Sequence, residues 1–343
     1  IVSAAHAALD AGQTKYTSAQ GIIELRQCIA DFYRSQDIAI PVERILVTSG
    51  ASGGLVLLAS LLLDVGDELL ITDPGYPCNE VFAKLVGGVP IKVPVSAENR
   101  FQPTLADIQN AWGENTKGVL LASPANPTGT ILHPDEFIAI QNFVAARGGF
   151  FILDEIYQNL TRDHVTYTSG LSLCPEIFVL NSFSKFFGMT GWRLGWVVVP
   201  EAAVESLTKL AQNLFISPST PAQYAAVAAF ADDTMSIHNQ RKKTFEARAK
   251  ILSQGLVALG FNIPVMPDGA FYLYVDISHT NMDSADFCWR LIEDYQVAVT
   301  PGYDFGDSNA GNYVRFAYTT SEESIVLGLD RLGKALADWE VKV

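Results

Sequence analysis

The stretch Ser182-Phe-Ser-Lys-Phe-Phe-Gly-Met-Thr-Gly-Trp-Arg-Leu-Gly-Trp196 places an amine between two groups that can hold an anion. Lys185 follows Ser182 by three residues and precedes Arg193 by eight. A lysine whose neighbours lower its pKa can form a Schiff base with an aldehyde, while a serine hydroxyl and an arginine can bind an anion beside it. A surface loop with glycine turns is the alternative, but it explains a lone Ser-x-x-Lys motif better than it explains the whole run.

Short apolar runs lie on both sides of this stretch and recur through the first two thirds of the chain. They have four or five residues each and are almost continuously hydrophobic, as expected of strands that are buried on both faces. We expect strands over Ile45–Thr48, Glu68–Thr72, Val89–Val93, Gly118–Ala122, Phe150–Leu153, Ile177–Leu180 and Leu194–Val198. Helical patterns alternate with them, over Gly53–Leu63, Cys78–Leu85, Leu105–Trp112 and Pro134–Arg147. This alternation predicts an α/β fold with a mainly parallel seven-stranded sheet flanked by helices.

A second, smaller α+β domain is predicted for the C-terminal part of the chain. The segment Ser217–Ile251 has a helical pattern with a basic second half that could connect two domains. Strands are then expected within Gly269–Ile277 and over Tyr313–Ala317, and helices over Ser284–Tyr295 and Glu322–Trp339. We therefore predict a large α/β domain over residues 12–240 and a small domain built from residues 1–11 and 241–343.

Composition and charge narrow the classes of partner. The chain has 343 residues, of which 49% are hydrophobic, and a formal net charge of −14. Such an acidic chain is a poor partner for nucleic acid or an anionic membrane. The longest apolar run, Leu55–Leu63, is too short to span a bilayer.

Cysteines and histidines indicate neither disulfides nor a metal site. The four cysteines lie far apart with no Cys-x-x-Cys pair, which predicts free thiols in a reducing cytoplasm. The five histidines are scattered without metal-ligand spacing, so we expect no bound metal. The chain starts at Ile1 without a basic n-region or a methionine, so we expect no signal peptide and expect further residues before Ile1.

The turn Val47–Gly54 is rich in small residues and joins a predicted strand to a predicted helix. Small residues let backbone amides approach an anion at a helix N-terminus. Ala51 and Ser52 are therefore candidates for one wall of a phosphate site, with Ser182 and Arg193 as the other. The segment is neither a Walker A loop nor a complete dinucleotide motif, and a simple tight turn is an equal alternative.

Two acids, Asp154 and Glu155, end the hydrophobic run Phe150–Leu153. A carboxylate at the C-terminal end of a buried parallel strand lies where α/β proteins bind ligands, and it needs a cationic partner if it is buried. A protonated pyridine nitrogen is such a partner, and pyridoxal phosphate carries both that ring and the aldehyde that Lys185 requires. For the two acids alone, a solvated strand end that caps a helix is the alternative.

Arg315 lies inside the apolar strand Tyr313–Ala317. Arginine is rarely buried without a partner, so an anion is expected beside it. Its planar fork suits the bidentate binding of a carboxylate. That carboxylate belongs either to an internal Asp or Glu or to a substrate.

Further motifs complete a family resemblance. They are Lys15-Tyr16, Asp73-Pro-Gly-Tyr76-Pro77 and Ser123-Pro-Ala-Asn126-Pro-Thr-Gly129. With the motifs above they resemble the class I/II pyridoxal phosphate-dependent aminotransferases, of fold type I and similar to aspartate aminotransferase. The resemblance runs from Tyr16 to Arg315 with the motifs in the family's order. It implies pyridoxal 5′-phosphate as cofactor, an amino acid and a 2-oxo acid as substrates, and a homodimer with shared active sites.

The resemblance also implies roles for single residues. Lys185 would hold the cofactor as a Schiff base and then act as general base at the substrate Cα. The cofactor ring would contact Tyr76, Asn126, Asp154 and Tyr157, and its phosphate would contact Ala51, Ser52, Ser182, Arg193 and Tyr16 of the partner subunit. Arg315 and Asn126 would bind the substrate. An X-Pro bond in the Asn126 turn is expected to be cis.

The function implied is a ping-pong aminotransferase, and alternatives use the same residues. A fold-type-I β-lyase acting on sulfur amino acids, or a decarboxylating synthase, would need the same Lys185 and Asp154. A non-catalytic regulatory module that binds the cofactor is an alternative of another class. For the amino donor, Ser52 and Gly53 stand where some aspartate-type relatives carry a lysine, which favours a neutral donor.

Overall fold

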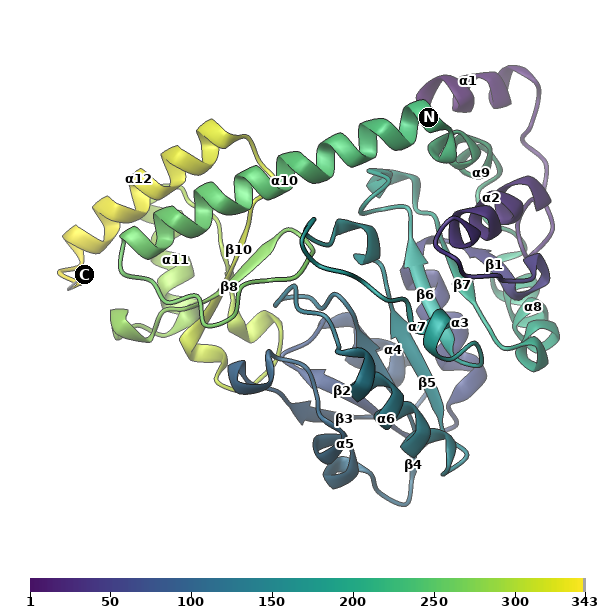
Figure 1. Ribbon diagram of the computed structural model, residues 1–343, viewed down its shortest axis with the longest axis horizontal. Coiled ribbons are helices and arrows are strands. Elements are labelled where there is room, and N and C mark those ends of the chain that lie inside the picture. The colour runs from purple at the N-terminus through teal and green to yellow at the C-terminus, as the bar shows by residue number, and fades with distance from the viewer. Residues whose placement is uncertain (342–343) are drawn as a thin grey trace.

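A seven-stranded sheet forms the centre of the larger part of the molecule (Figure 1). The computed structural model describes residues 1–341. The strand order is β1-β7-β6-β5-β4-β2-β3. The strands are β1 (Ile45–Thr48), β2 (Glu68–Asp73), β3 (Val89–Pro94), β4 (Thr116–Ala122), β5 (Phe150–Asp154), β6 (Phe178–Ser182) and β7 (Gly195–Val198). Each lies within a residue or two of its predicted range, so the predicted α/β fold is confirmed.

Alternate residues of these strands enter two separate hydrophobic cores, one on each face of the sheet. One face is covered by α2 (Ile23–Arg34), α5 (Leu105–Ala111), α6 (Pro134–Ala145), α7 (Gly170–Leu173) and α9 (Thr220–Val227). The other is covered by α3 (Gly50–Leu62), α4 (Cys78–Leu85) and α8 (Glu201–Phe215). Burial on both faces explains why the strands appear in the sequence as continuous apolar runs.

Strand β7 is the exception to the parallel pattern, since it is antiparallel to both of its neighbours. Ser182 at the end of β6 pairs with Gly195 at the start of β7. The stretch that links the two strands therefore reverses the chain at the carboxyl edge of the sheet. This loop carries Lys185 and Arg193 to the edge where α/β proteins bind ligands.

A three-stranded antiparallel sheet, in the order β8-β10-β9, lies in the smaller part of the molecule. Its strands are β8 (Tyr272–Asp276), β9 (Thr300–Pro301) and β10 (Tyr313–Ala317), and it shares a core with α10 (Asp232–Ala258), α11 (Ser284–Tyr295) and α12 (Glu322–Asp338). The smaller α+β unit is thus also as predicted. Within residues 1–341, no helix combines the length and apolarity needed to cross a bilayer, and no cluster of three His, Cys, Asp or Glu side chains could hold a metal ion.

The domain boundaries remain a prediction. Helix α10 runs unbroken through residue 240, from α9 to the small sheet (Figure 1). Helix α1 (Val2–Asp10) packs against α9, far from the small sheet, so these contacts give no support to grouping residues 1–11 with the smaller domain. Of the range 241–343, the last two residues lie outside the described part of the chain.

The loop of residues 302–308 follows β9 of the small sheet and contacts the end of β2 in the large sheet. Asp73, the last residue of β2, is buried, and its carboxylate accepts hydrogen bonds from the backbone N–H groups of Asp307 at 3.1 Å and Ser308 at 3.3 Å. The backbone N–H of Gly75 donates to the Phe305 carbonyl at 2.8 Å. A carboxylate bonded to backbone amides makes strong, charge-assisted hydrogen bonds, so this loop has a defined position against the large sheet.

Gly306 is the point of closest approach in this contact, and Gly306→Ala is expected to destabilise the protein. A Cβ added there would lie 1.8 Å from Oδ1 of Asp73, so the loop must move and the buried carboxylate loses partners. We expect a loss of about 1–3 kcal/mol in the free energy of unfolding, measured by thermal denaturation. Gly328→Ala in α12 is the matched control, because a Cβ there meets no atom within 4 Å. An unchanged melting temperature for Gly306→Ala would contradict the proposed contact.

Candidate active site

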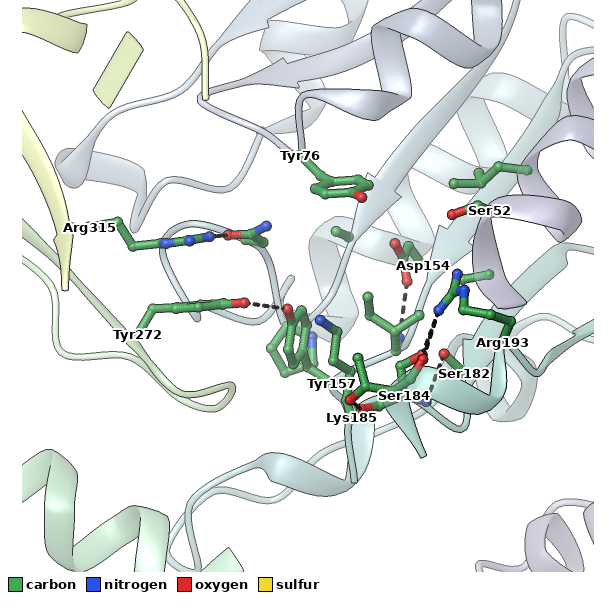
Figure 2. Close-up of a pocket in the computed structure, with 17 residues that line it drawn as sticks. Ser52, Tyr76, Asp154, Tyr157, Ser182, Ser184, Lys185, Arg193, Tyr272 and Arg315 are labelled. Carbon is green, nitrogen blue, oxygen red and sulfur yellow. Dashed lines mark hydrogen bonds between the residues drawn. The ribbon is translucent and has the colours of Figure 1, made fainter. Parts of the chain in front are cut away.

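A cavity of about 240 Å³ opens where the carboxyl ends of β2, β4, β5 and β6 meet. It brings together ten of the predicted site residues: Ala51, Ser52, Tyr76, Asn126, Asp154, Tyr157, Ser182, Lys185, Arg193 and Arg315. Tyr16 is not among its lining residues and is 79% exposed. Figure 2 shows Arg315 at one end of the cavity and Ser52 and Arg193 at the other, with Asp154 and Lys185 between them.

Lys185 extends its amine into the middle of this cavity (Figure 2). Its Nζ lies 5.3 Å from the ring centroid of Tyr157 and 5.6 Å from that of Phe271. Burial lowers the pKa of the amine; Asp154 opposes this shift, and the two arginines at the ends of the cavity add to it. A lowered pKa increases the fraction of neutral amine, which is the nucleophilic form.

Asp154 ends β5 and is only 4% exposed. Its Oδ1 accepts a hydrogen bond from the backbone N–H of Ile156 at 3.0 Å. Burial raises the pKa of this carboxyl to about 6, although that hydrogen bond and Lys185 oppose the shift. The alternative of a solvated strand end is therefore wrong, and a buried carboxylate faces the cavity.

Glu155 is completely buried next to Asp154 but has its own partners. Its carboxylate accepts hydrogen bonds from the Tyr167 hydroxyl at 3.0 Å, the Ser169 hydroxyl at 2.9 Å and the Gly170 backbone N–H at 2.8 Å. Burial nevertheless raises its pKa to about 7. Glu155 does not line the cavity, so Asp154 is the acid available to a ligand.

The end of the cavity beside α3 has the features of an anion site. Helix α3 begins at Gly50, three residues earlier than predicted, so Ser52 lies in its first turn with the unbonded amides of the helix N-terminus. Arg193 lies opposite, where its Nη1 donates to the Thr190 carbonyl at 3.1 Å. Gly50 has a φ of +71°, which favours glycine, and a Cβ there would lie 2.6 Å from Nη2 of Arg193, so the guanidinium would have to shift.

Arg315 is held at the other end of the cavity by uncharged groups. Its Nη1 donates to Oδ1 of Asn126 at 2.8 Å, and its Nη2 donates to the Thr300 hydroxyl at 3.3 Å. The guanidinium carbon lies 4.2 Å from the ring centroid of Tyr272 and 4.7 Å from that of Phe305. Among residues 1–341 no carboxylate forms an ion pair with Arg315, so the alternative of an internal salt bridge is wrong.

Two tyrosines form further walls. Tyr76 follows β2, and its ring lies across the cavity from Lys185 and Tyr157 (Figure 2). Tyr157 is buried, and its hydroxyl lies 2.7 Å from that of Tyr272. Burial raises the pKa of both Tyr76 and Tyr157. The turn after β4 contains two cis X-Pro bonds, Ser123–Pro124 and Asn126–Pro127, where one was expected.

Sequence reasoning missed several lining residues, chiefly Ser184, Thr190 and Tyr272. Ser184 lies inside the Ser182–Trp196 stretch, and its hydroxyl accepts from Nη1 of Arg193 at 3.4 Å. The one signal for Tyr272 was a hydroxyl in a strand expected to be buried, since a buried tyrosine usually has a partner for its O–H, but Tyr274 on the same strand carries the same signal. Nothing in a single sequence indicates that this partner is Tyr157, 115 positions away.

The residues present fit pyridoxal phosphate. Oδ1 of the buried Asp154 carboxylate has a hydrogen-bond donor, and the group faces the cavity, where a protonated ring nitrogen would offset its burial. An arginine, a serine and a helix N-terminus lie where a phosphate would bind, and an amine lies between the two sites. Arg315, without an anionic partner among the described residues, leaves a place for a carboxylate.

Comparisons with known proteins identify the family of the chain. Residues 1–332 match the family aminotransferase class I and II. The chain is 36% identical over 341 residues to a valine–pyruvate aminotransferase of Mycobacterium tuberculosis, covering 98% of this chain and 87% of the relative. It is 34% identical over 339 residues to an aspartate aminotransferase of Pyrococcus horikoshii, covering 98% and 86%.

A solved structure of an aminotransferase from Mycobacterium tuberculosis superposes with a TM-score of 0.94 at 36% identity, covering 98% of this chain and 87% of that one. These relatives favour transamination over the β-lyase and non-catalytic alternatives. The chain belongs to the class I and II aminotransferases and is a pyridoxal phosphate-dependent enzyme that moves an amino group between an amino acid and a 2-oxo acid.

Proposed function

We propose that Lys185 binds the cofactor covalently and that the other cavity residues bind it and the substrate in the roles expected from the sequence. The observation that supports this most is the grouping of a partly buried amine, a buried carboxylate and an arginine–serine anion site in one cavity. Hydride reduction of the enzyme with its cofactor, followed by peptide mapping, tests it. A label on Lys185 is expected, and a label on another lysine would overturn the assignment.

Each group then has a defined task. When bound, the cofactor supplies an aldehyde that takes up the amino group and a ring that accepts electrons. Asp154 keeps the ring nitrogen protonated, and the amine of Lys185 moves a proton from the substrate Cα. Arg315 binds the α-carboxylate with its planar fork, while Asn126 holds both that arginine and the cofactor's 3′-oxygen.

Arg193 is proposed to hold the phosphate, so Arg193→Ala is expected to weaken cofactor binding. Loss of a charge-assisted contact of about 1.5–3 kcal/mol corresponds to an increase of about 10- to 150-fold in the dissociation constant, measured by titration of the apoenzyme. Arg34→Ala is the control, because Arg34 is exposed and pairs with Asp31 in its own helix. Equal cofactor affinity in the two variants would contradict the phosphate role.

The amino donor is proposed to have an uncharged side chain. Among residues 1–341, the cations that line the cavity are Lys185, Arg193 and Arg315, and each already has a proposed task. Ser52 stands in the phosphate loop, and one relative is named for valine and pyruvate. Valine or alanine should therefore have a higher kcat/KM than aspartate, and the reverse order would refute this choice.

A homodimer and a cytoplasmic location complete the proposal. Tyr16 is far more exposed than the cavity residues, which suits a side chain that reaches the phosphate of the partner subunit. All four cysteines are free, as in a reducing compartment. We also propose that residues 12–240 form the domain that binds the cofactor. Arg315 then belongs to the smaller domain, which contains the chain after residue 240. A monomer in sedimentation, or Tyr16→Phe with unaltered cofactor affinity, would contradict the shared site.

A further inference from the structure

Tyr272 has two different partners: one contacts the face of its ring and the other its hydroxyl. It lies in β8 and is 5% exposed, and it lines the cavity (Figure 2). Its ring faces the guanidinium of Arg315, with 4.2 Å between the guanidinium carbon and the ring centroid. Its hydroxyl lies 2.7 Å from the hydroxyl of Tyr157. One residue thus connects the Arg315 end of the cavity to its middle, where Tyr157 lies beside Lys185.

The ring contact restricts the plane of the Arg315 guanidinium. Phe305 lies 4.7 Å from the same carbon, so two aromatic rings contact the cation. Asn126 and Thr300 accept hydrogen bonds from its Nη1 and Nη2, while its Nε is buried with no partner among residues 1–341. A guanidinium fixed in this way presents its remaining N–H groups to a carboxylate with little rearrangement.

The hydroxyl contact sets the direction of a hydrogen bond. One of the two phenols must donate to the other, because both are neutral when burial raises their pKa. If Tyr157 is to donate to the cofactor's 3′-oxygen, its own oxygen must accept from Tyr272. Among residues 1–341 no other group forms a hydrogen bond with the Tyr157 hydroxyl, so the Tyr272 hydroxyl is what holds the Tyr157 proton toward the cavity.

We propose that Tyr272 is a positioning residue with two separable tasks: its ring holds the fork of Arg315 for the substrate carboxylate, and its hydroxyl holds Tyr157 as a donor to the cofactor. The inference rests on the proposed function, since it needs Arg315 and Tyr157 in their roles. If Tyr272 has both tasks, then binding of the substrate carboxylate and the protonation state of the cofactor both depend on this one side chain.

Two substitutions separate the tasks. Tyr272→Phe keeps the ring and removes the hydroxyl, so KM for the amino acid should change less than about twofold. The pH midpoint of the bound cofactor's absorption should move by about half a unit or more, since a neutral hydrogen bond is worth about 1 kcal/mol. Tyr272→Leu removes both, so KM should also rise by between about 2- and 30-fold.

Tyr274→Phe is the matched control. Tyr274 lies on the same strand, is buried, and its hydroxyl has no hydrogen-bond partner among the described residues, while its side chain does not line the cavity. Neither KM nor the pH midpoint should change in this variant.

An unchanged pH midpoint in Tyr272→Phe, or equal changes in KM for the Phe and Leu variants, would overturn the proposal. If the Leu variant does not fold, the Phe variant alone still decides the hydroxyl task. Hydride labelling of the unaltered enzyme separates the two failures: without a label on Lys185 the proposed function is wrong, and with it only the role of Tyr272 is.

Discussion

Lys185→Ala is expected to reduce transamination by at least about 10⁴-fold, because one side chain provides both the nucleophile and the general base. The amine lies in the middle of the cavity, 5.3 Å from the Tyr157 ring, with its pKa lowered by burial. Among residues 1–341 no other lysine lines the cavity, so none of the lining residues can replace it. Hydride labelling of the reconstituted variant measures the loss of the nucleophile, and single-turnover assays measure the loss of the general base.

Two further variants make this result specific. Lys185→Arg keeps the positive charge but not a titratable amine, so it should be as inactive as the alanine variant. Lys209→Ala removes an exposed lysine that pairs with Glu205 in α8 and should leave turnover unchanged. Near-normal turnover of Lys185→Arg would mean that only charge is needed, which contradicts the assigned chemistry.

Asp154→Asn is expected to lower kcat by about 10²- to 10⁴-fold, the range that corresponds to about 3–5 kcal/mol for a broken buried charge pair. The amide has the same shape and can still accept from the Ile156 N–H, but it cannot keep a ring nitrogen protonated. Glu155→Gln is the control, because that carboxylate is bonded to Tyr167, Ser169 and Gly170 outside the cavity. Equal turnover per bound cofactor in Asp154→Asn and the unaltered enzyme would refute the role.

The same variant, Asp154→Asn, should increase the stability of the apoenzyme at neutral pH, although it lowers kcat. The pKa of Asp154 is raised from 3.8 to about 6 on folding, so its contribution to stability is fully present below pH 3.8 and is lost as pH rises through 6. The amide that replaces it has no charge to bury. Thermal unfolding of the two apoproteins should therefore agree near pH 4 and favour the variant above pH 7, and a variant that is less stable at both pH values would contradict this.

Most of the fold could be predicted from the sequence because the large sheet is buried on both faces. Strands such as β1 and β6 then appear as unbroken apolar runs between glycine, proline and acidic residues. The antiparallel direction of β7 was not predictable, since its apolar run is no different from those of parallel strands. Strand β9 has only two residues, Thr300–Pro301, and therefore no periodic pattern to detect.

The candidate site was predictable wherever a residue type is rare in its surroundings, such as a carboxylate ending a buried strand or an arginine inside one. Tyr272 was missed because tyrosine is common in strands and its partners, Tyr157 and Arg315, come from distant parts of the chain. The position of Asp73 was missed for a similar reason. Its bonds to the loop of residues 302–308 exist only once this loop lies against the end of β2.

The anchoring of that loop limits how the enzyme could be re-engineered. The carbonyl of Phe305 accepts a hydrogen bond from the Gly75 backbone N–H, and its ring contacts the guanidinium of Arg315. The segment from Phe305 to Arg315 is therefore held in place at both ends. Insertions or deletions between them would pull the cation away from its aromatic neighbours. Libraries aimed at new amino donors should keep the length of this segment constant and vary side chains around the cavity instead.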